Sequence, residues 1–354
     1  MNSPHRIEAR QNEPQLRSWL LAQKLLYSRV KRLMGLQLTL VVVGIALALF
    51  GGLGTWRPDL AQAAAAVPLW VGPLFGLAVA LLNTFWIPTR QQRWRSDAAH
   101  VQELFDTELL QMPWPQAGTT ISDDEMRRAQ VFDAAQPSRA LKDDDPTNWY
   151  DPSAVAVALR RKKPESEGWL RPDSGRHTLD DLPLALARLV CQSQNLQWDL
   201  RQRDRYGDWL RALFWGLWLL ALLPALVENM PVQVWLLKVL SPIVPGLLLL
   251  HQMASEQKRV VDRLKSMQER WAKIWEEALA DPQRSDLDAQ ARELQDRIFQ
   301  HRRTAPPFFD WLYELWLYEL WRQGNQAHTQ QVACDRVDEA VAALKSLAAR
   351  PTSH

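Results

Sequence analysis

Long apolar stretches with almost no charge alternate with charged, amphipathic stretches along this chain. The apolar stretches come as two close pairs, Leu33–Gly54 with Val67–Ile87 and Ala212–Val227 with Val232–Leu250. A helix rises about 1.5 Å per residue, so roughly 20 apolar residues cross the hydrocarbon core of a bilayer. The first two stretches reach this length without a charge, and Trp209-Leu210 extends the shorter third stretch. The pattern therefore predicts four transmembrane helices arranged as two hairpins.

Positive charge flanks the outer ends of both pairs and is scarce in the short loops within them. The flanking basic residues are Lys31, Arg32, Arg90, Arg93, Arg95, Arg201, Arg203, Arg205, Arg211, Lys258 and Arg259. Cytoplasmic segments next to membrane spans carry the excess of lysine and arginine. We therefore expect both termini and the long central segment to lie in the cytoplasm.

The segments outside the apolar pairs are expected to be mostly helical. Apolar residues at three- to four-residue spacing predict helices at 16–30, 94–105 and 260–278, which should pack together as a stalk. Asp281-Pro282 is expected to end the third of these helices, and a last amphipathic helix is expected around Val337–Leu347. The predicted fold is an all-α integral membrane protein with a mostly helical cytoplasmic part. Its predicted segments are an N-terminal amphipathic helix (1–32), a first hairpin (33–87), a helical and loop-rich region (88–209), a second hairpin (210–252) and a C-terminal helical region (253–354).

Few polar or helix-breaking residues interrupt the predicted spans. Lys238 lies about two turns into the fourth span, where its ammonium either reaches the interface or faces the interior of a bundle. Pro242 and Pro245 follow it and leave backbone carbonyls without their usual donors. Together with Gln37 and Asn83, these residues are the candidates for lining or gating a pore. The spans lack the polar stripe of a permanently open channel, so we expect a closed resting state.

Small residues recur at every fourth position in the first hairpin. They are Gly44, Ala48 and Gly52 in one span and Gly72, Gly76 and Ala80 in the other. Such faces permit close backbone approach between helices in lipid. The pairing is either within one hairpin or between subunits.

Motifs of known enzymes are absent from the sequence. It contains no phosphate-binding glycine loop, no HExxH and no GxSxG, and Cys191 and Cys334 lie too far apart to form a known metal-ligand spacing. A formal net charge of +2 gives no argument for nucleic-acid binding. We therefore expect no catalytic residue, cofactor or metal. The alternative is an enzyme with an unfamiliar site built on the carboxylates Asp123-Asp124 and Asp143–Asp145.

Prolines are frequent in residues 113–183. We therefore expect this segment to be rich in loops, with a flexible insertion at Glu165–Gly175. The basic run Arg160–Lys163 is either a solvated loop or a site for an anionic ligand or lipid headgroups. The repeat Trp311–Leu315 and Trp316–Leu320 has a period that matches no helix face, and we expect it to pack against the stalk or the membrane surface.

A series of short motifs is spread through the chain. The motifs are Arg10–Asn12, Ala22–Ser28, Gln102–Asp106, Met112–Trp114, Asn148–Tyr150, Cys191–Asn195, Trp198-Asp199, Arg201, Ile298-Phe299, His301-Arg302, Pro306-Pro307, Trp311 and Tyr313. In these motifs, and in their order around two hairpins, the chain resembles the S-4TM family. The members of that family are four-transmembrane effectors found beside cyclic-oligonucleotide synthases in bacterial anti-phage operons of the CBASS type.

The resemblance implies a multi-pass effector of the bacterial inner membrane that acts in abortive infection and is not an enzyme. A cognate nucleotidyltransferase would supply a cyclic di- or trinucleotide as the signal. On binding it, the protein would assemble as a homo-oligomer or open a pore and permeabilise the lipid bilayer. The alternative is a membrane receptor or scaffold that recruits a cytoplasmic partner without forming a pore.

A cyclic nucleotide requires cations for its phosphates and aromatic rings for its bases. A cluster of such residues precedes the third span: Arg201, Arg203 and Arg205 with Trp198 and Tyr206. These residues are the candidate nucleotide site. The alternative explanation for the arginines is membrane anchoring combined with ion pairs to Asp199, Asp204 and Asp208.

Overall fold

The computed structural model describes residues 7–11, 13–53, 78–79, 81–113, 177–227, 231–306 and 316–349. The regular structure in these residues is entirely helical. In chain order the elements are α1 (Ile7–Arg10), α2 (Pro14–Leu53), η1 (Leu82–Trp86), α5 (Ile87–Leu109), η2 (Leu179–Asp181), α8 (Leu184–Val227), α9 (Val232–Trp235), η3 (Leu236–Leu240), α10 (Ser241–Ala280), α11 (Leu287–Thr304) and α13 (Trp316–Ala348). The all-α prediction is confirmed for this part of the chain.

Several predicted features lie outside the described residues. They are most of the second span with Gly72, Gly76 and Ala80, the carboxylates Asp123-Asp124 and Asp143–Asp145, the runs Arg160–Lys163 and Glu165–Gly175, and the first copy of the aromatic repeat, Trp311–Leu315. Within the described ranges, no helix combines the length and apolar character needed to cross a membrane.

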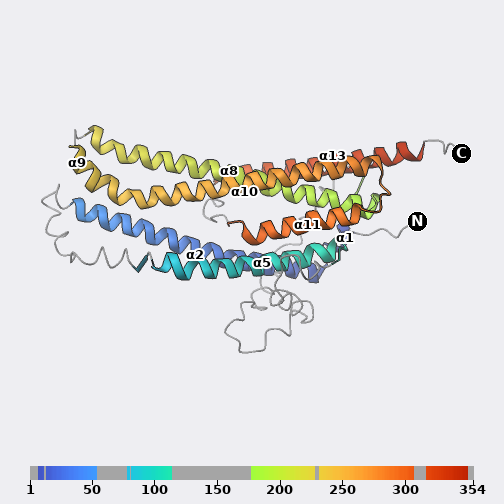
Figure 1. Ribbon diagram of the computed structural model, residues 1–354, viewed down its shortest axis with the longest axis horizontal. Coiled ribbons are helices and arrows are strands. Elements are labelled where there is room, and N and C mark those ends of the chain that lie inside the picture. The colour runs from blue at the N-terminus through green and yellow to red at the C-terminus, as the bar shows by residue number, and fades with distance from the viewer. Residues whose placement is uncertain are drawn as a thin grey trace, which may run out of the picture.

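Two long antiparallel helix pairs form an elongated bundle (Figure 1). One pair is α2 with α5, and the other is α8 with α10. Helix α11 lies between the two pairs, and α13 runs along α8 and α10. Helix α1 and the C-terminal end of α13 lie at one end of the bundle, and α9 lies at the other.

The long helices continue from the predicted cytoplasmic segments into the predicted spans. Helix α2 covers residues on both sides of Leu33, and α8 does the same on both sides of Ala212. Helix α10 carries the fourth stretch into the predicted stalk and ends at Ala280, directly before Asp281-Pro282 as predicted. Each of these helices is continuous and therefore connects the two ends of the bundle.

The predicted stalk was incomplete. It contained parts of α2, α5 and α10, but α10 packs mainly on α8, and α11 occupies the space beside α5 and α8. Residues 184–209 and 287–304 also form stalk helices, which the apolar periodicity did not predict. Their buried faces carry polar residues such as Gln192, Ser193 and Gln295, which interrupt the apolar periodicity that identifies a buried helix.

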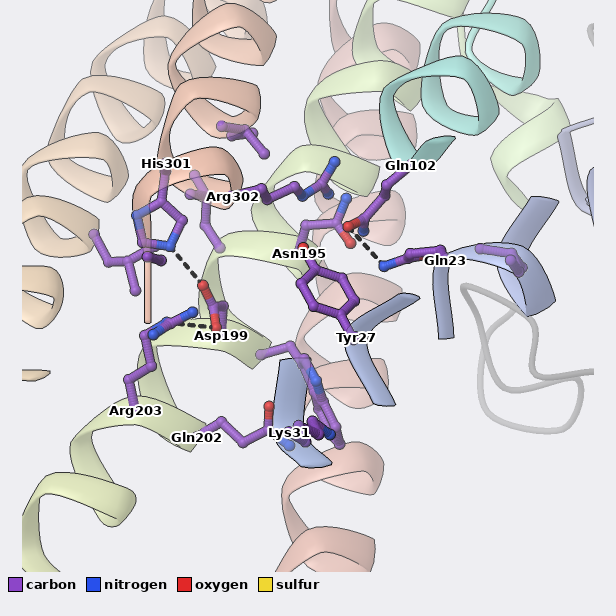
Figure 2. A pocket seen from close by; sticks show the side chains of 16 residues that line it. Gln23, Tyr27, Lys31, Gln102, Asn195, Asp199, Gln202, Arg203, His301 and Arg302 are labelled. Atoms are coloured by element: carbon purple, nitrogen blue, oxygen red, sulfur yellow. Dashed lines mark hydrogen bonds and ion pairs between the residues drawn. The ribbon is translucent and has the colours of Figure 1, made fainter. Parts of the chain in front are cut away.

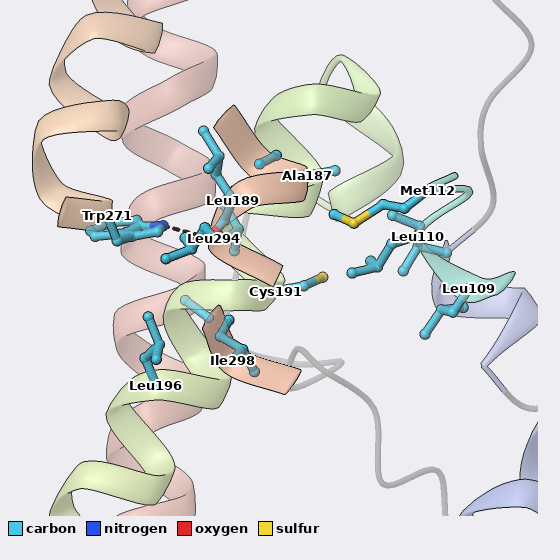
Figure 3. Packing of buried hydrophobic residues seen from close by; sticks show 14 of the residues in the cluster. Leu109, Leu110, Met112, Ala187, Leu189, Cys191, Leu196, Trp271, Leu294 and Ile298 are labelled. Carbon is cyan, nitrogen blue, oxygen red and sulfur yellow. Dashed lines mark hydrogen bonds between the residues drawn. The ribbon is translucent and has the colours of Figure 1, made fainter. Parts of the chain in front are cut away.

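The central core contains the predicted apolar seam of α10 (Figure 3). The buried seam residues are Val260, Leu264, Met267, Trp271, Ile274 and Ala278. The indole nitrogen of Trp271 donates a hydrogen bond of 2.7 Å to the carbonyl oxygen of Leu189 on α8. The Trp271 ring also stacks on Trp275, with 5.4 Å between centroids. Cys191 and Cys334 are buried in the same core.

Both described π-helical segments precede a proline. Segment η1 leads into α5, whose second residue is Pro88, and η3 leads into α10, whose second residue is Pro242. Proline has no backbone N–H and crowds the carbonyl of the residue four positions earlier. The wider π turn accommodates this clash without ending the helix.

Gln111, just after α5, has a positive φ of 52°, a conformation that costs a side chain about 1–2 kcal/mol. Its carbonyl and that of Leu110 accept hydrogen bonds from buried Arg188, so the turn is held in place. We expect Gln111→Gly to raise the free energy of unfolding by up to about 1 kcal/mol, as measured by chemical denaturation in detergent. Gln111→Ala retains the Cβ atom and serves as the control. An equal gain in stability in both variants would show that the positive φ of Gln111 is not the cause.

Candidate functional site

A cavity of about 390 Å3 lies where α2, α5, α8, α10 and α11 meet (Figure 2). Its volume is within the range of about 300–1,000 Å3 that is typical of small-molecule sites. Helix α2 contributes Tyr27 and Lys31, α8 contributes Asn195, and α11 contributes His301 and Arg302. Polar side chains from three helices therefore project into a cavity that lies inside a helical bundle.

The cavity collects residues from motifs that are far apart in the sequence. Its lining draws on the segments Ala22–Ser28, Gln102–Asp106, Cys191–Asn195, Trp198-Asp199 and His301-Arg302. These are the same segments in which the chain resembles the S-4TM effectors. Motifs that a functional family shares are expected to converge on its functional site, so the cavity is the strongest candidate in the described part of the chain.

One wall of the cavity is a hydrogen-bonded cluster around Asp199. His301 Nε2 lies 2.7 Å from Asp199 Oδ2, and Arg203 Nε donates to Asp199 Oδ1 at 2.8 Å. Arg203 Nη1 also donates to Gln257 Oε1 at 3.3 Å and to the Pro306 carbonyl at 3.0 Å. The cluster ties α8 to α10 and to the end of α11, so it fixes the relative positions of three helices.

Electrostatics determine the protonation states in this cluster. Burial by itself raises the pKa of Asp199, but the Arg203 guanidinium and the hydrogen bond with His301 hold that pKa well below its usual range. Burial lowers the pKa of His301, and the contact with Asp199 only partly offsets this effect. The imidazole is therefore neutral at pH 7, with the Nε2 proton directed at the carboxylate. Nδ1 is left as a buried acceptor with no hydrogen-bond partner among the described residues.

The same pKa shifts predict that acid destabilises the bundle. Because the folded state lowers the pKa of His301, unfolding takes up a proton, and stability decreases as the pH falls below about 6.5. Asp199 adds a further loss of stability below about pH 4, since the folded state lowers its pKa as well. Urea unfolding in detergent at pH 7.5, 6 and 5 measures the first effect.

In that experiment, His301→Gln should reduce the loss of stability between pH 7.5 and 5, because glutamine can still donate to Asp199 but does not titrate. His328→Gln is the control, since His328 is exposed on α13. Identical pH profiles for wild type and His301→Gln would refute the assignment.

A second polar network joins α5 to α11 behind the cavity. Arg302 forms a 2.5 Å ion pair with Asp106, and Arg292 forms one of the same length with Glu103. Gln295 Nε2 donates to both carboxylates, at 2.9 Å to Glu103 and 3.0 Å to Asp106. Burial raises the pKa of Glu103 against the effect of Arg292. Burial by itself lowers the pKa of Arg302, but the nearby Asp106 carboxylate raises it more, so the pKa of Arg302 is raised overall.

The structure separates the five candidate nucleotide-binding residues. Trp198 and Arg203 line the cavity. Arg201 and Arg205 are exposed on α8 and do not line it. Tyr206 is 1% exposed and packs in a separate apolar cluster with residues of α2 and α10. The binding role of these residues stays a prediction.

Most of the cavity was not predicted from the sequence. Gln23 and Tyr27 were expected only as part of a helical seam, and no binding role was predicted for Asn195, His301 and Arg302. A signal was present, because polar residues at helical spacing within an otherwise apolar seam indicate a buried polar site. Recognising the cavity also required the pairing of α2 with α8 and α11, which the local pattern does not contain.

Four of the five candidate pore-lining residues fall in the π-helical segments or shortly after one of them. Asn83 lies in η1, Lys238 lies in η3, and Pro242 and Pro245 lie in the first turns of α10. Gln37 is half-buried on α2. The side chains of the other four are outside the described part, so the pore-lining role stays a prediction.

Comparison with known proteins assigns the chain to a family. The model of the SMODS-associating 4TM effector domain (S_4TM) matches the chain in two overlapping stretches, residues 5–163 and 158–333. No curated protein and no solved structure matches the chain. The family match covers the cavity residues on α2, α5, α8, α10 and α11. From this match and the motifs that meet in the cavity, we conclude that the chain belongs to the SMODS-associating 4TM effector family.

Proposed function

We propose that this protein is a membrane effector of bacterial anti-phage defence. In this proposal, a cyclic oligonucleotide from a cognate nucleotidyltransferase binds the cytoplasmic part of the bundle. The protein then opens a pore, or assembles into one as a homo-oligomer, and the inner membrane loses its barrier. The family match supports an effector associated with such a synthase.

The distribution of exposed apolar side chains is the observation that carries the proposal. With the exception of Leu20, every large hydrophobic side chain that is exposed in the described residues lies within or next to a predicted span. On α8 these side chains include Trp215 (64% exposed), Leu219 (65%) and Leu226 (74%). Extensive exposed apolar surface is unfavourable in water and marks a lipid or protein contact.

We assign this surface to lipid because it surrounds several helices at one end of the bundle. It includes Leu36 and Val42 on α2, Leu219 on α8, and Val244 and Leu248 on α10. A partner protein normally covers one face of a bundle, whereas a bilayer covers all sides at the same depth. The basic residues Lys31, Arg32, Arg201, Arg205, Arg211, Lys258 and Arg259 lie next to this apolar end. By the positive-inside bias, this distribution supports a cytoplasmic location for both termini.

Signal binding can open the bundle only if the signal binds the open state better than the closed state. The cavity is formed by both helix pairs, since α2 and α5 line one side and α8 and α10 line another. A ligand in this position contacts both pairs and can change their separation. Helices α2, α8 and α10 continue into the predicted spans, so a change in separation reaches the apolar end.

Dye release from liposomes tests the proposal. Purified full-length protein is incorporated into vesicles filled with a self-quenching dye, and cyclic di- and trinucleotides are added one at a time. We expect release with one cyclic nucleotide and none without it, because the resting state is closed. If folded, inserted protein releases no dye with any of the cyclic nucleotides, the pore-forming proposal is wrong. The receptor or scaffold function would then be tested by capture of a cytoplasmic partner.

A further inference from the structure

The two ends of the cavity differ in chemistry (Figure 2). At one end Gln23 and Gln102 are joined by a 2.8 Å hydrogen bond, and Asn195 lies beside them. Asn195 Nδ2 is buried and has no hydrogen-bond partner among the described residues. At the other end Lys31 and Arg203 approach from α2 and α8. This basic end faces the predicted membrane, because both helices enter their apolar stretches shortly after these residues.

Aromatic rings line the space between the two ends. In Figure 2 the ring of Tyr27 lies between the amide end and the basic end, and Trp198 also lines the cavity. Burial raises the pKa of Tyr27, so its phenol stays neutral at physiological pH. A neutral aromatic ring is a suitable surface for stacking a base, an interaction worth about 1–3 kcal/mol.

The charge of the lining favours an anion. Its cations are Lys31, Arg203 and Arg302, against which stand Asp199, paired with Arg203, and Asp106, paired with Arg302 from α5, while His301 is neutral, so that one net positive charge remains. Such an excess of positive charge inside low-dielectric walls attracts anionic ligands. Lys31 and Arg203 at one end, the buried amide of Asn195 at the other and an aromatic ring between them match the phosphate, base edge and base plane of a nucleotide.

We infer that this cavity binds one nucleotide unit of the signal, with the base stacked on Tyr27 beside Asn195 and the phosphate at Lys31. The inference rests on the proposed function and names the site at which the signal acts. Asn195 Nδ2 supplies a buried donor without a partner among the described residues, and the edge of a nucleobase presents acceptors for it. The phosphate is placed between Lys31 of α2 and Arg203 of α8, which belong to different helix pairs. The negative charge of the phosphate therefore attracts a cation from each helix pair and changes the distance between the pairs.

Equilibrium binding of radiolabelled cyclic di- and trinucleotides of adenosine, guanosine and uridine tests the inference. The full-length protein is used in neutral detergent. We expect Asn195→Ala, Tyr27→Ala and Lys31→Ala each to weaken binding about tenfold, the effect of losing one hydrogen bond, stack or charge contact. Tyr27→Phe retains the neutral ring and should stay within about twofold of wild type. Lys31→Ala should also reduce the salt dependence of binding.

Arg205→Ala is the matched control, because it removes an exposed cation from α8 outside the cavity. Asn195→Asp preserves the side-chain volume and should weaken binding of the anionic probe at least as much as Asn195→Ala. Thermal unfolding confirms that each variant is folded. Wild-type affinity in folded Asn195→Asp and Tyr27→Ala would overturn the site.

The outcomes separate this inference from the proposed function. If wild type binds one probe and releases dye while the cavity variants bind normally, the function stands and the site is wrong. If wild type binds no probe, both are wrong. Loss of nucleotide binding in Lys31→Ala but not in Asn195→Asp would show that the probe contacts only the basic end, as any phosphate-bearing anion would, and would overturn the nucleotide site.

Discussion

Replacing Leu219 with arginine is expected to remove most of the protein from the membrane fraction. Leu219 is 65% exposed near the middle of the third predicted span. In water such a substitution changes stability by no more than about 0.5 kcal/mol. In the centre of a bilayer an arginine costs about 2.5–3.5 kcal/mol, which corresponds to roughly a hundredfold loss of inserted protein. Fractionation after an alkaline carbonate wash measures the effect directly.

Asp204→Arg is the control for this experiment, because it introduces the same residue at an exposed position of the same helix outside the apolar stretch. It should insert as wild type does. Leu219→Arg protein that remains in the washed membranes would show that this face of α8 does not contact lipid.

Replacing Arg302 with methionine is expected to lower the free energy of unfolding by about 3–5 kcal/mol, because it breaks a buried ion pair. Asp106 is 1% exposed, and among the described side chains its other hydrogen bond comes from the neutral amide of Gln295. The Asp106 carboxylate would thus be left buried without a cation. Chemical denaturation in detergent, followed by far-UV circular dichroism, measures the loss.

Two further variants test whether the loss of the buried ion pair causes this destabilisation. Arg297→Met breaks an exposed pair with Glu293 and should cost about 1 kcal/mol or less. The double variant Arg302→Met with Asp106→Leu removes both charges and should recover most of the stability. A small effect of Arg302→Met, or no recovery in the double variant, would show that the pair does not stabilise the interface between α5 and α11.

Much of the helical architecture could be predicted from local pattern. The apolar seam of α10 repeats at three- and four-residue steps, and the sequence places a proline directly after its last turn. Helix α13 was predicted around Val337–Leu347 for the same reason, although it begins much earlier, at Trp316. These features depend on residues within a few turns of one another, where side-chain spacing determines which face is buried.

The candidate site was less predictable. The clustered arginines before the third span were predicted to form one site because they are close in sequence. A helix, however, directs neighbouring side chains to different faces. Arg203 points into the cavity, while Arg201 and Arg205, two residues away on either side, are exposed. Residues two positions apart do not share a helix face. Sequence proximity was therefore a poor guide to the composition of the site.

The sequence by itself determined the helical class, the apolar stretches and the segments of family resemblance, because these properties depend on composition and short-range spacing. Only the tertiary structure decided that α11 lies between the two helix pairs and that Tyr27, Asn195 and His301 surround one cavity. Asn195 and His301 are more than 100 positions apart, and their meeting depends on how whole helices pack. That packing is set by the buried ion pairs and hydrogen bonds of Asp106, Asp199 and Arg203, whose partners no local pattern identifies.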